Sequence, residues 1–247
     1  MNVRVEPQTD CQVPACTWRI RITKTGLTRY MSHLDFVRTV ERAVRRAGLP
    51  IVLSSGFNPR PRLSFAPALP VGVSSISEFV DILLSEPVDV SEATERLNGS
   101  LPCGMQVTSS KMLPRNTPAL SVIVQAASYR LKFSGETEVR VDGILAAIEE
   151  LMKSDSVFIE RTTSKGVRRV DIRPLIYEMR VDGDSSSWSV YAIVASGSKG
   201  SVRPFDLAKV ILEAGGLEDS GVFVDITREG LYTLCDGKLC LPWYLGP

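Results

Sequence analysis

Histidine is almost absent from this sequence of 247 residues, because His33 is the only one. A single histidine excludes metal sites built from several imidazoles and most histidine proton relays. The five cysteines are an odd number in a chain of this size, which argues against a disulfide scaffold. No apolar run approaches the ~20 residues that a membrane span needs, and residues 1–17 lack the apolar segment of a signal peptide. We therefore expect a cytoplasmic protein without a membrane partner.

Charge is distributed unevenly along the chain, although 29 lysines and arginines nearly balance 28 aspartates and glutamates. Residues 19–62 contain ten basic side chains, nine of them arginine, and only two acidic ones, whereas residues 78–100 are acidic. Arginine suits bidentate phosphate contacts and stacking on bases. A solvated helix face with ordinary ion pairs would give the same pattern. The sequence leaves both interpretations open.

The first half of the chain predicts the element order β-α-β-β-(β)-α-β, which is a βαββαβ pattern with one additional short strand. Residues 18–25 alternate apolar and polar side chains as a half-buried strand does. Ser32 and Asp35 have capping-box spacing and predict a helix over 33–47. Four further strands are expected at 51–54, 63–65, 79–84 and 105–109, and one further helix is expected at 90–98.

The second half repeats this order of elements without matching residues. A strand at 129–133 precedes an amphipathic helix at 138–153, and Pro204 begins a helix that ends before Gly215. Asp236-Gly237 predicts a hairpin with a type I′ turn. The remaining strands are expected at 157–162, 169–173, 176–181, 188–195 and 222–226.

These patterns predict an α+β fold class. We expect two tandem ferredoxin-like (βαββαβ) domains with antiparallel sheets, followed by a C-terminal hairpin. The expected boundaries place a tail at 1–17, the first domain at 18–112, a linker at 113–127 and the second domain at 128–247. The composition, with 44% hydrophobic and 23% charged residues, agrees with a globular protein of this kind.

The predicted helix at 33–47 carries its arginines on one face. At 100° per residue, Val40 and Val44 lie on one side of the helix and the arginines lie on the other. The following turn at 55–62 is stiffened by two prolines, which lowers the entropic cost of binding, and Phe57 can stack on a base. A second basic cluster follows at 161–173. The candidate RNA-binding residues from these segments are Arg38, Arg42, Arg45, Arg46, Phe57, Arg60, Arg62 and Arg169.

His33 and Tyr30 provide an enzymatic alternative. A metal-free ribonuclease needs a general base for the 2′-hydroxyl group and a cation for the phosphorane charge. His33, Tyr30 and either Arg29 or Arg38 could fill these roles. However, His33 falls in the first helical turn, towards the apolar side, where a histidine commonly has a structural role. We therefore expect no catalytic residue.

Two further motifs suggest ligands. Cys11-x4-Cys16 and Cys235-x4-Cys240 together offer four thiolates for zinc, but structural zinc sites use CxxC spacing more often. The glycine-rich segment 197–201 precedes a helix, where N–H groups can hold a phosphate, but its residue order does not match a P-loop. We expect a flexible turn at 197–201, no metal and no cofactor.

A distinctive block occupies residues 27–84, with LTRYMSHLDFVRTVERAVRRAGLP followed by SGFNPRPRLSFAPALPVG. This block closely resembles the start of the radical SAM-linked family, a bacterial domain of unknown function. Shorter similarities follow at YRLKF, KGVRRVDIRPLIYEMRV and SVRPFDLAKVIL. The chain has no CxxxCxxC motif for a radical SAM cluster, so the resemblance implies the linked domain alone.

The resemblance implies a radical SAM enzyme, encoded nearby, as partner. Members of that family also occur near an RNase of the E/G type and near ribosomal protein genes, which implies work on RNA or on translation. It further suggests that Arg203, which is also a candidate RNA-binding residue, lines a groove with Asp171, Arg173 and Pro174. The expected architecture is also similar to that of the CRISPR-repeat RNA endonucleases, although their glycine-rich loop near the C-terminus has no clear match here.

We therefore expect a non-catalytic RNA-binding or substrate-presenting accessory module of a radical SAM enzyme. Its RNA would be tRNA or rRNA, and nothing in the sequence indicates specificity for DNA. A metal-independent endoribonuclease and a protein adapter that binds no RNA are the alternatives.

Overall fold

The computed structural model describes residues 16–134, 141–163, 166–183, 188–197, 200–217 and 221–243. These residues form a mixed α+β fold with five α-helices, one large and mostly antiparallel sheet of ten strands, and a separate two-stranded sheet. No helix in the described ranges is long and apolar enough to cross a membrane. The predicted N-terminal tail lies outside the described residues up to position 15, and residues 16 and 17 already belong to the first strand.

The first half of the chain contributes one end of the large sheet and two α-helices. Its elements are β1 (Cys16–Lys24), the 3-10 helix η1 (Gly26–Tyr30), α1 (His33–Arg46), β2 (Leu63–Phe65), β3 (Ser74–Leu84), α2 (Val90–Asn98) and β4 (Val107–Pro114). Strand β1 pairs antiparallel with both β3 and β4, and β2 pairs antiparallel with β3. The prediction of a strand at 51–54 was wrong, because this segment makes only the isolated bridges Ile51–Leu84 and Leu53–Pro61. Proline at 61 has no N–H group with which to extend a ladder.

Helix α1 begins where the sequence predicted it. The Ser32 hydroxyl oxygen accepts a hydrogen bond from the Asp35 N–H at 3.2 Å, which satisfies one of the free donors of the first turn. The buried face of α1 includes Val40 and Val44, which join a core cluster with Trp18 of β1. This packing fixes the opposite face of α1 towards solvent.

The second half contributes the other end of the sheet and three α-helices. Its elements are α3 (Leu120–Ile123), β5 (Ala126–Ser134), α4 (Val141–Lys153), β6 (Phe158–Thr163), β7 (Gly166–Asp171), the 3-10 helix η2 (Arg173–Leu175), β8 (Ile176–Gly183), β9 (Trp188–Gly197), β10 (Gly200–Ser201), α5 (Pro204–Ala214), β11 (Phe223–Cys235) and β12 (Lys238–Cys240). Strand β5 pairs antiparallel with β9 and β11, and β8 pairs with β9. Strands β6 and β7 form the separate hairpin.

The predicted C-terminal hairpin is confirmed. Strands β11 and β12 pair antiparallel, with Cys235 opposite Lys238. Asp236 and Gly237 have φ angles of 51° and 74°, as a type I′ turn requires. Glycine supplies the second of these positive φ angles without steric strain.

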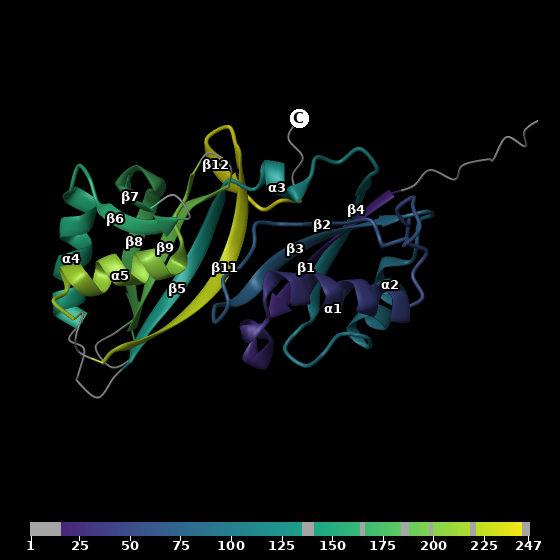
Figure 1. Ribbon diagram of the computed structural model, residues 1–247, viewed down its shortest axis with the longest axis horizontal. Coiled ribbons are helices and arrows are strands. Elements are labelled where there is room, and N and C mark those ends of the chain that lie inside the picture. Colours follow the sequence, from purple (N-terminus) through teal and green to yellow (C-terminus); the bar gives the residue numbers. More distant parts are fainter. Residues whose placement is uncertain are drawn as a thin grey trace, which may run out of the picture.

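The two halves join edge to edge through β3 and β11. These strands pair in parallel, with Ser74 opposite Thr227 and Ser75 opposite Arg228. The strand order is therefore β10-β9-β5-β11-β3-β1-β4, with β8 beside β9, β2 beside β3 and β12 beside β11. Figure 1 shows α4 and α5 beside the strands of the second half, α1 and α2 beside those of the first, and β11 next to β3 in the middle.

A buried ion pair reinforces this junction. Arg228 of β11 is 1% exposed, and its Nε donates to Glu78 Oε1 of β3 at 2.9 Å, while Nη1 donates to the Pro67 carbonyl at 3.1 Å. Burial by itself lowers the pKa of the Arg228 guanidinium, but the Glu78 carboxylate and Tyr129 raise it overall, so the charge is kept. The Lys24 ammonium group also interacts electrostatically with Glu78 and donates to the Met31 carbonyl at 2.9 Å.

The C-terminal segment is attached to the first half by a second buried arginine. Arg19 of β1 is fully buried and donates to both carboxylate oxygens of Asp81, at 2.6 and 2.8 Å. It also donates to the carbonyl oxygens of Pro118 and Pro242. The Trp243 ring packs edge-to-face on Phe79 with 4.9 Å between centroids. The segment after β12 therefore covers part of the first half's sheet.

The junction predicts unequal effects of two substitutions. Glu78→Leu leaves the Arg228 guanidinium and the Lys24 ammonium group buried without a carboxylate, and the free energy of unfolding should fall by about 3–5 kcal/mol. Arg228→Met should cost less, because Lys24 still offsets the Glu78 charge. Urea unfolding of both variants measures the difference, and equal losses, or a larger loss for Arg228→Met, would contradict this account.

Candidate functional site

The exposed face of α1 is the most strongly basic helix surface in the described structure. Arg38, Arg42, Arg45 and Arg46 are all solvent-exposed, which confirms the placement predicted from the helical period. The apolar face of the helix, which packs on the sheet, makes this placement obligatory. The arginines therefore contribute little to the core.

Few of these arginines have an acidic partner. Arg42 makes no ion pair or side-chain hydrogen bond with any described residue, and Arg38 lies 3.8 Å from Asp35, at the outer limit of an ion pair. Arg45 and Arg46 donate to the carbonyl oxygens of Pro59 and Ser100. Carbonyl contacts do not neutralise a guanidinium charge, so the face keeps a net positive potential that attracts anions.

The loop at 55–62 lies next to this helix and is held in place by hydrogen bonds. Arg45 Nη2 donates to the Pro59 carbonyl at 2.9 Å, and the N–H of Ser54 donates to the Arg60 carbonyl at 2.8 Å. Phe57 at the loop tip is fully exposed, so it does not fill the edge of the core. Arg60 and Arg62 are exposed as well. We call the exposed side chains of α1 and this loop the arginine face: Arg38, Arg42, Arg45, Arg46, Phe57, Arg60 and Arg62.

A second group, of a half-buried arginine and two exposed aromatic side chains, marks the junction between the halves. Arg29 donates through Nε to the Gly72 carbonyl at 2.6 Å, and its Nη2 lies 2.5 Å from Asp225 Oδ1 of β11. Tyr30, 62% exposed, lies beside this guanidinium, with 5.9 Å from the Arg29 Cζ to the ring centroid. Phe205 at the start of α5 is 48% exposed and lies over Gly72, 3.9 Å from where a Cβ atom would sit. Two exposed aromatic rings, one from each half, and a half-buried arginine that is paired with Asp225 therefore lie at the junction.

Sequence reasoning missed Phe205. The sequence does contain a signal for it. The Phe205 side chain follows Arg203-Pro204 at the start of a helix and does not lie on the buried apolar face of that helix. Arg203 is exposed at the N-cap position of α5, as the predicted ligand contact requires.

The β6–β7 hairpin adds a third basic group. Arg169 is exposed, and its guanidinium lies 4.0 Å from the centroid of the Phe158 ring, a stacked arrangement. Asp171 and Arg173 instead hold backbone: Asp171 Oδ1 accepts from the N–H groups of Val157 and Arg173, and Arg173 Nη2 donates to the Met152 carbonyl at 2.7 Å. Asp171 and Arg173 therefore stabilise the turn that connects β7 to β8.

His33 has aromatic surroundings. It is half-buried at the first position of α1, and its ring packs edge-to-face against Phe65 with 6.0 Å between centroids. Phe65 in turn packs against Phe36. Within the described ranges, His33 has no hydrogen bond to Tyr30 or to an arginine. The predicted dyad of His33 and Tyr30 is therefore not assembled by direct contact.

The cysteines of the C-terminal hairpin face one another. Cys11 lies outside the described residues. Cys235 and Cys240 lie close enough across the hairpin for their thiols to interact. The pKa of the Cys235 thiol is raised, mainly by desolvation and further by the hydrogen bond with the Cys240 thiol. In the part of the chain that the structure describes, no group of three or more histidine, cysteine, aspartate or glutamate side chains gathers to hold a metal ion.

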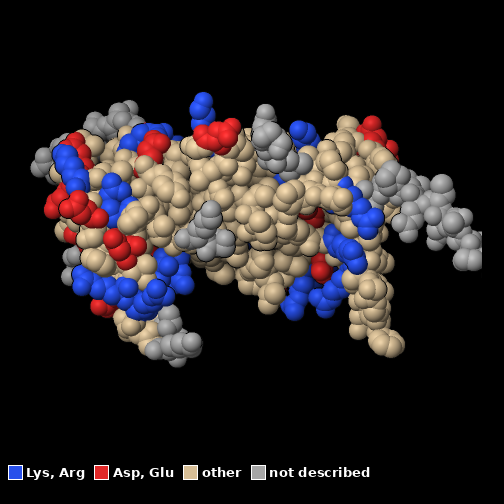
Figure 2. Space-filling model, turned by 90° about the horizontal axis from the view of Figure 1, so that it is seen from above, with Lys and Arg blue, Asp and Glu red and all other residues tan. Residues whose placement is uncertain are grey.

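The surface view shows how basic side chains are arranged. Figure 2 shows Lys and Arg side chains on both flanks of a broad hollow along the lower edge of the view, the side that faces the viewer in Figure 1. Basic surface is thus present on both halves rather than on α1 alone.

The loop contact predicts different roles for two neighbouring arginines. Arg45→Ala removes the hydrogen bond to Pro59 and should make amide hydrogen exchange at 54–60 about 5-fold faster, because a net hydrogen bond contributes about 1 kcal/mol. Arg42→Ala, the matched control on the same helix face, should leave exchange in the loop unchanged. The same exchange rates in both variants would show that Arg45 does not order the loop.

Comparisons with known proteins give a family but no activity. No curated protein matches the chain. One solved structure, "Crystal Structure of a Cbf5-Nop10-Gar1 Complex", is similar with a TM-score of 0.45 at 13% identity, over 85% of this chain and 47% of that chain, so the chain spans about half the length of the protein it matches. A family model described as "Uncharacterized protein conserved in bacteria (DUF2344)" matches residues 18–204. The chain belongs to this uncharacterized bacterial family.

Proposed function

We propose that this protein is a non-catalytic RNA-binding or substrate-presenting accessory module. The observation that carries the proposal is the arginine face, where exposed guanidinium groups lie beside a fully exposed Phe57 and have few acidic partners. Arginines elsewhere in the fold, such as Arg19 and Arg228, are neutralised by carboxylates. The arginine face thus retains the charge needed to bind a polyanion.

Exposed aromatic rings favour unpaired RNA over a duplex. Phe57, Tyr30 and Phe205 are all accessible, and Phe158 lies under the Arg169 guanidinium. Proteins that bind single-stranded RNA combine cationic grooves for phosphates with aromatic rings on which bases stack. These aromatic–arginine groups occur in both halves of the chain, so we propose that one RNA strand contacts both halves.

The architecture proposed for this module is a pair of ferredoxin-like units. The strand order β4-β1-β3-β2 in the first half and β11-β5-β9-β8 in the second supports this assignment, since both orders are antiparallel and each unit has two helices as crossovers. The β6–β7 hairpin would be an insertion after the first helix of the second unit. The CRISPR-repeat RNA endonucleases have a similar expected architecture and bind RNA, which supports RNA as the ligand.

A companion enzyme would supply the chemistry. The residues at 27–84 resemble the radical SAM-linked family, which supports a radical SAM enzyme in the cytoplasm as the partner, with tRNA or rRNA as the shared substrate. The chain has no CxxxCxxC motif. In this proposal its own residues position the RNA, and the partner carries the reaction.

A salt series tests whether the arginine face contacts phosphates. Arg38→Ala combined with Arg42→Ala should lower the slope of log K against log salt by about 1.4 for a single-stranded RNA, because each lost phosphate contact removes ~0.7. A gel shift with an unstructured single-stranded RNA at several salt concentrations measures this slope, and a parallel gel with total small RNA reports binding and cleavage of folded RNA.

The matched control removes two lysines from other helices. Lys153→Ala combined with Lys209→Ala causes the same change in net charge, but each lysine is paired with a glutamate on its own helix, at 3.2 and 3.3 Å. This variant should keep the slope of the unmodified protein. If both double variants lose affinity equally, the binding is non-specific. If the RNA stays intact and unshifted at low salt, the protein binds no RNA and the protein-adapter alternative is favoured. If cleavage products form and disappear with His33→Ala, the endoribonuclease alternative is favoured.

A further inference from the structure

A pocket lies apart from the arginine face, where the end of β9 meets α3, β8 and β11. Its cavity volume is about 130 Å³, which is smaller than a pocket for a drug-sized ligand and suits a ligand group no larger than a single ring system. None of the predicted RNA-binding residues lines it. The lining residues are Val122, Gln125, Leu175, Tyr177, Ala195, Gly197, Gly200 and Leu234.

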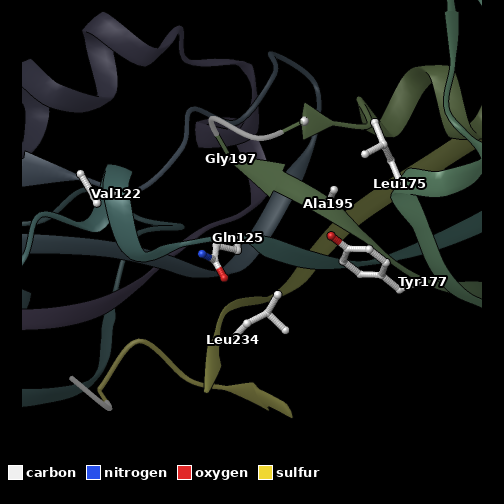
Figure 3. A pocket seen from close by; sticks show the side chains of 8 residues that line it. Val122, Gln125, Leu175, Tyr177, Ala195, Gly197 and Leu234 are labelled. Carbon is white, nitrogen blue, oxygen red and sulfur yellow. The ribbon is translucent and has the colours of Figure 1, made fainter. Parts of the chain in front are cut away.

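The pocket combines apolar walls with two polar groups. Figure 3 shows the side chains of Gln125, Tyr177 and Leu234 arranged around the same space, from the segment before β5, from β8 and from β11. Neither the Gln125 amide nor the Tyr177 hydroxyl has a hydrogen-bond partner among the described residues. The lining contains no charged side chain, so it favours a neutral ligand group.

The backbone holds Gln125 in a fixed position. Its N–H donates to the Tyr232 carbonyl at 2.9 Å, and its carbonyl accepts from the Ser196 N–H at 2.9 Å, so the residue is held between β11 and β9. The backbone that carries the side-chain amide is therefore already ordered at the edge of the pocket, so the main chain needs no rearrangement on binding.

Two glycines form one wall. A Cβ atom at Gly197 would lie 2.6 Å from the Val124 carbonyl, and one at Gly200 would lie 2.8 Å from Leu175 Cδ2, where φ is also +152°. Only glycine allows the chain to approach this closely. The glycine-rich segment expected to be a flexible turn thus forms part of the pocket wall at Gly197 and Gly200, while residues 198–199 lie outside the described residues.

We propose that this pocket binds a nucleobase. A primary amide offers a donor and an acceptor side by side and pairs bidentately with base edges, best with adenine. Leu175, Leu234 and the Tyr177 ring provide the apolar and aromatic surfaces that a base plane requires. The base belongs either to a free nucleoside or to an unpaired nucleotide of the bound RNA, and only the second source depends on the proposed function.

The test follows the Gln125 side-chain amide signals by NMR while adenosine, guanosine, cytidine or uridine is added to the full-length protein. Adenosine should shift these signals at the lowest concentration. Gln125→Met keeps the length of the side chain and should weaken adenosine binding about 10-fold or more, read from other pocket signals. Leu234→Trp should fill the pocket and abolish binding. Gln106→Met, at an exposed glutamine of the first half, is the control and should change nothing.

Binding of unpaired RNA by the same variants separates the two sources. A loss of RNA affinity with Gln125→Met assigns the pocket to an RNA nucleotide, and unchanged RNA affinity with loss of adenosine binding assigns it to a free nucleoside. Nucleoside binding in a protein that fails to bind RNA would support the pocket and refute the proposed function. The proposal is overturned if no nucleoside at millimolar concentration shifts the Gln125 signals and neither pocket variant changes RNA affinity.

Discussion

The buried ion pair between Glu78 and Arg228 is the interaction on which the arrangement of this protein depends. The parallel contact between β3 and β11 spans only two residue pairs, which is a short ladder for joining two halves of this size. The Arg228 guanidinium supplies hydrogen bonds to Glu78 and to the Pro67 carbonyl in addition to that ladder. Because a buried charge without its partner is strongly destabilising, the pair favours one relative position of the two halves. The buried Arg19, which is neutralised by Asp81, also donates to the Pro242 carbonyl and so attaches the C-terminal segment.

Two sets of arginines in this chain thus have different roles. Arg19 and Arg228 are buried, bind carboxylates and carbonyl oxygens, and stabilise the fold. The arginines of α1 and the 55–62 loop are exposed, and the few contacts they make with protein mostly involve carbonyl groups. A surface that only needed solubility would interleave both signs of charge more evenly. The uncompensated arginines, together with exposed aromatic rings on both halves, form the physical basis for proposing RNA as the ligand.

Local features of the fold could be predicted from the sequence, whereas long-range ones could not. The Ser32 cap, helix α2 and the Asp236-Gly237 hairpin depend on residues within a few positions of one another, and the structure has all three. The contact between β3 and β11 joins residues about 150 positions apart, and no periodicity encodes it. For the same reason Arg19 counted among the basic side chains of residues 19–62, although it is buried against Asp81 and the C-terminal segment. The residues that line the pocket around Gln125 come from six elements and from the segment before β5, so no local sequence motif predicts the pocket.

The central claim is that the joined halves present one continuous surface to a single RNA strand. Photocrosslinking of a 4-thiouridine-labelled, unstructured RNA, followed by mass spectrometry of the crosslinked peptides, tests this claim directly. The account predicts crosslinks in the 55–62 loop of the first half and also near Phe205 or Phe158 of the second half. Crosslinks confined to one half, or spread without regard to the arginine and aromatic groups, would contradict it.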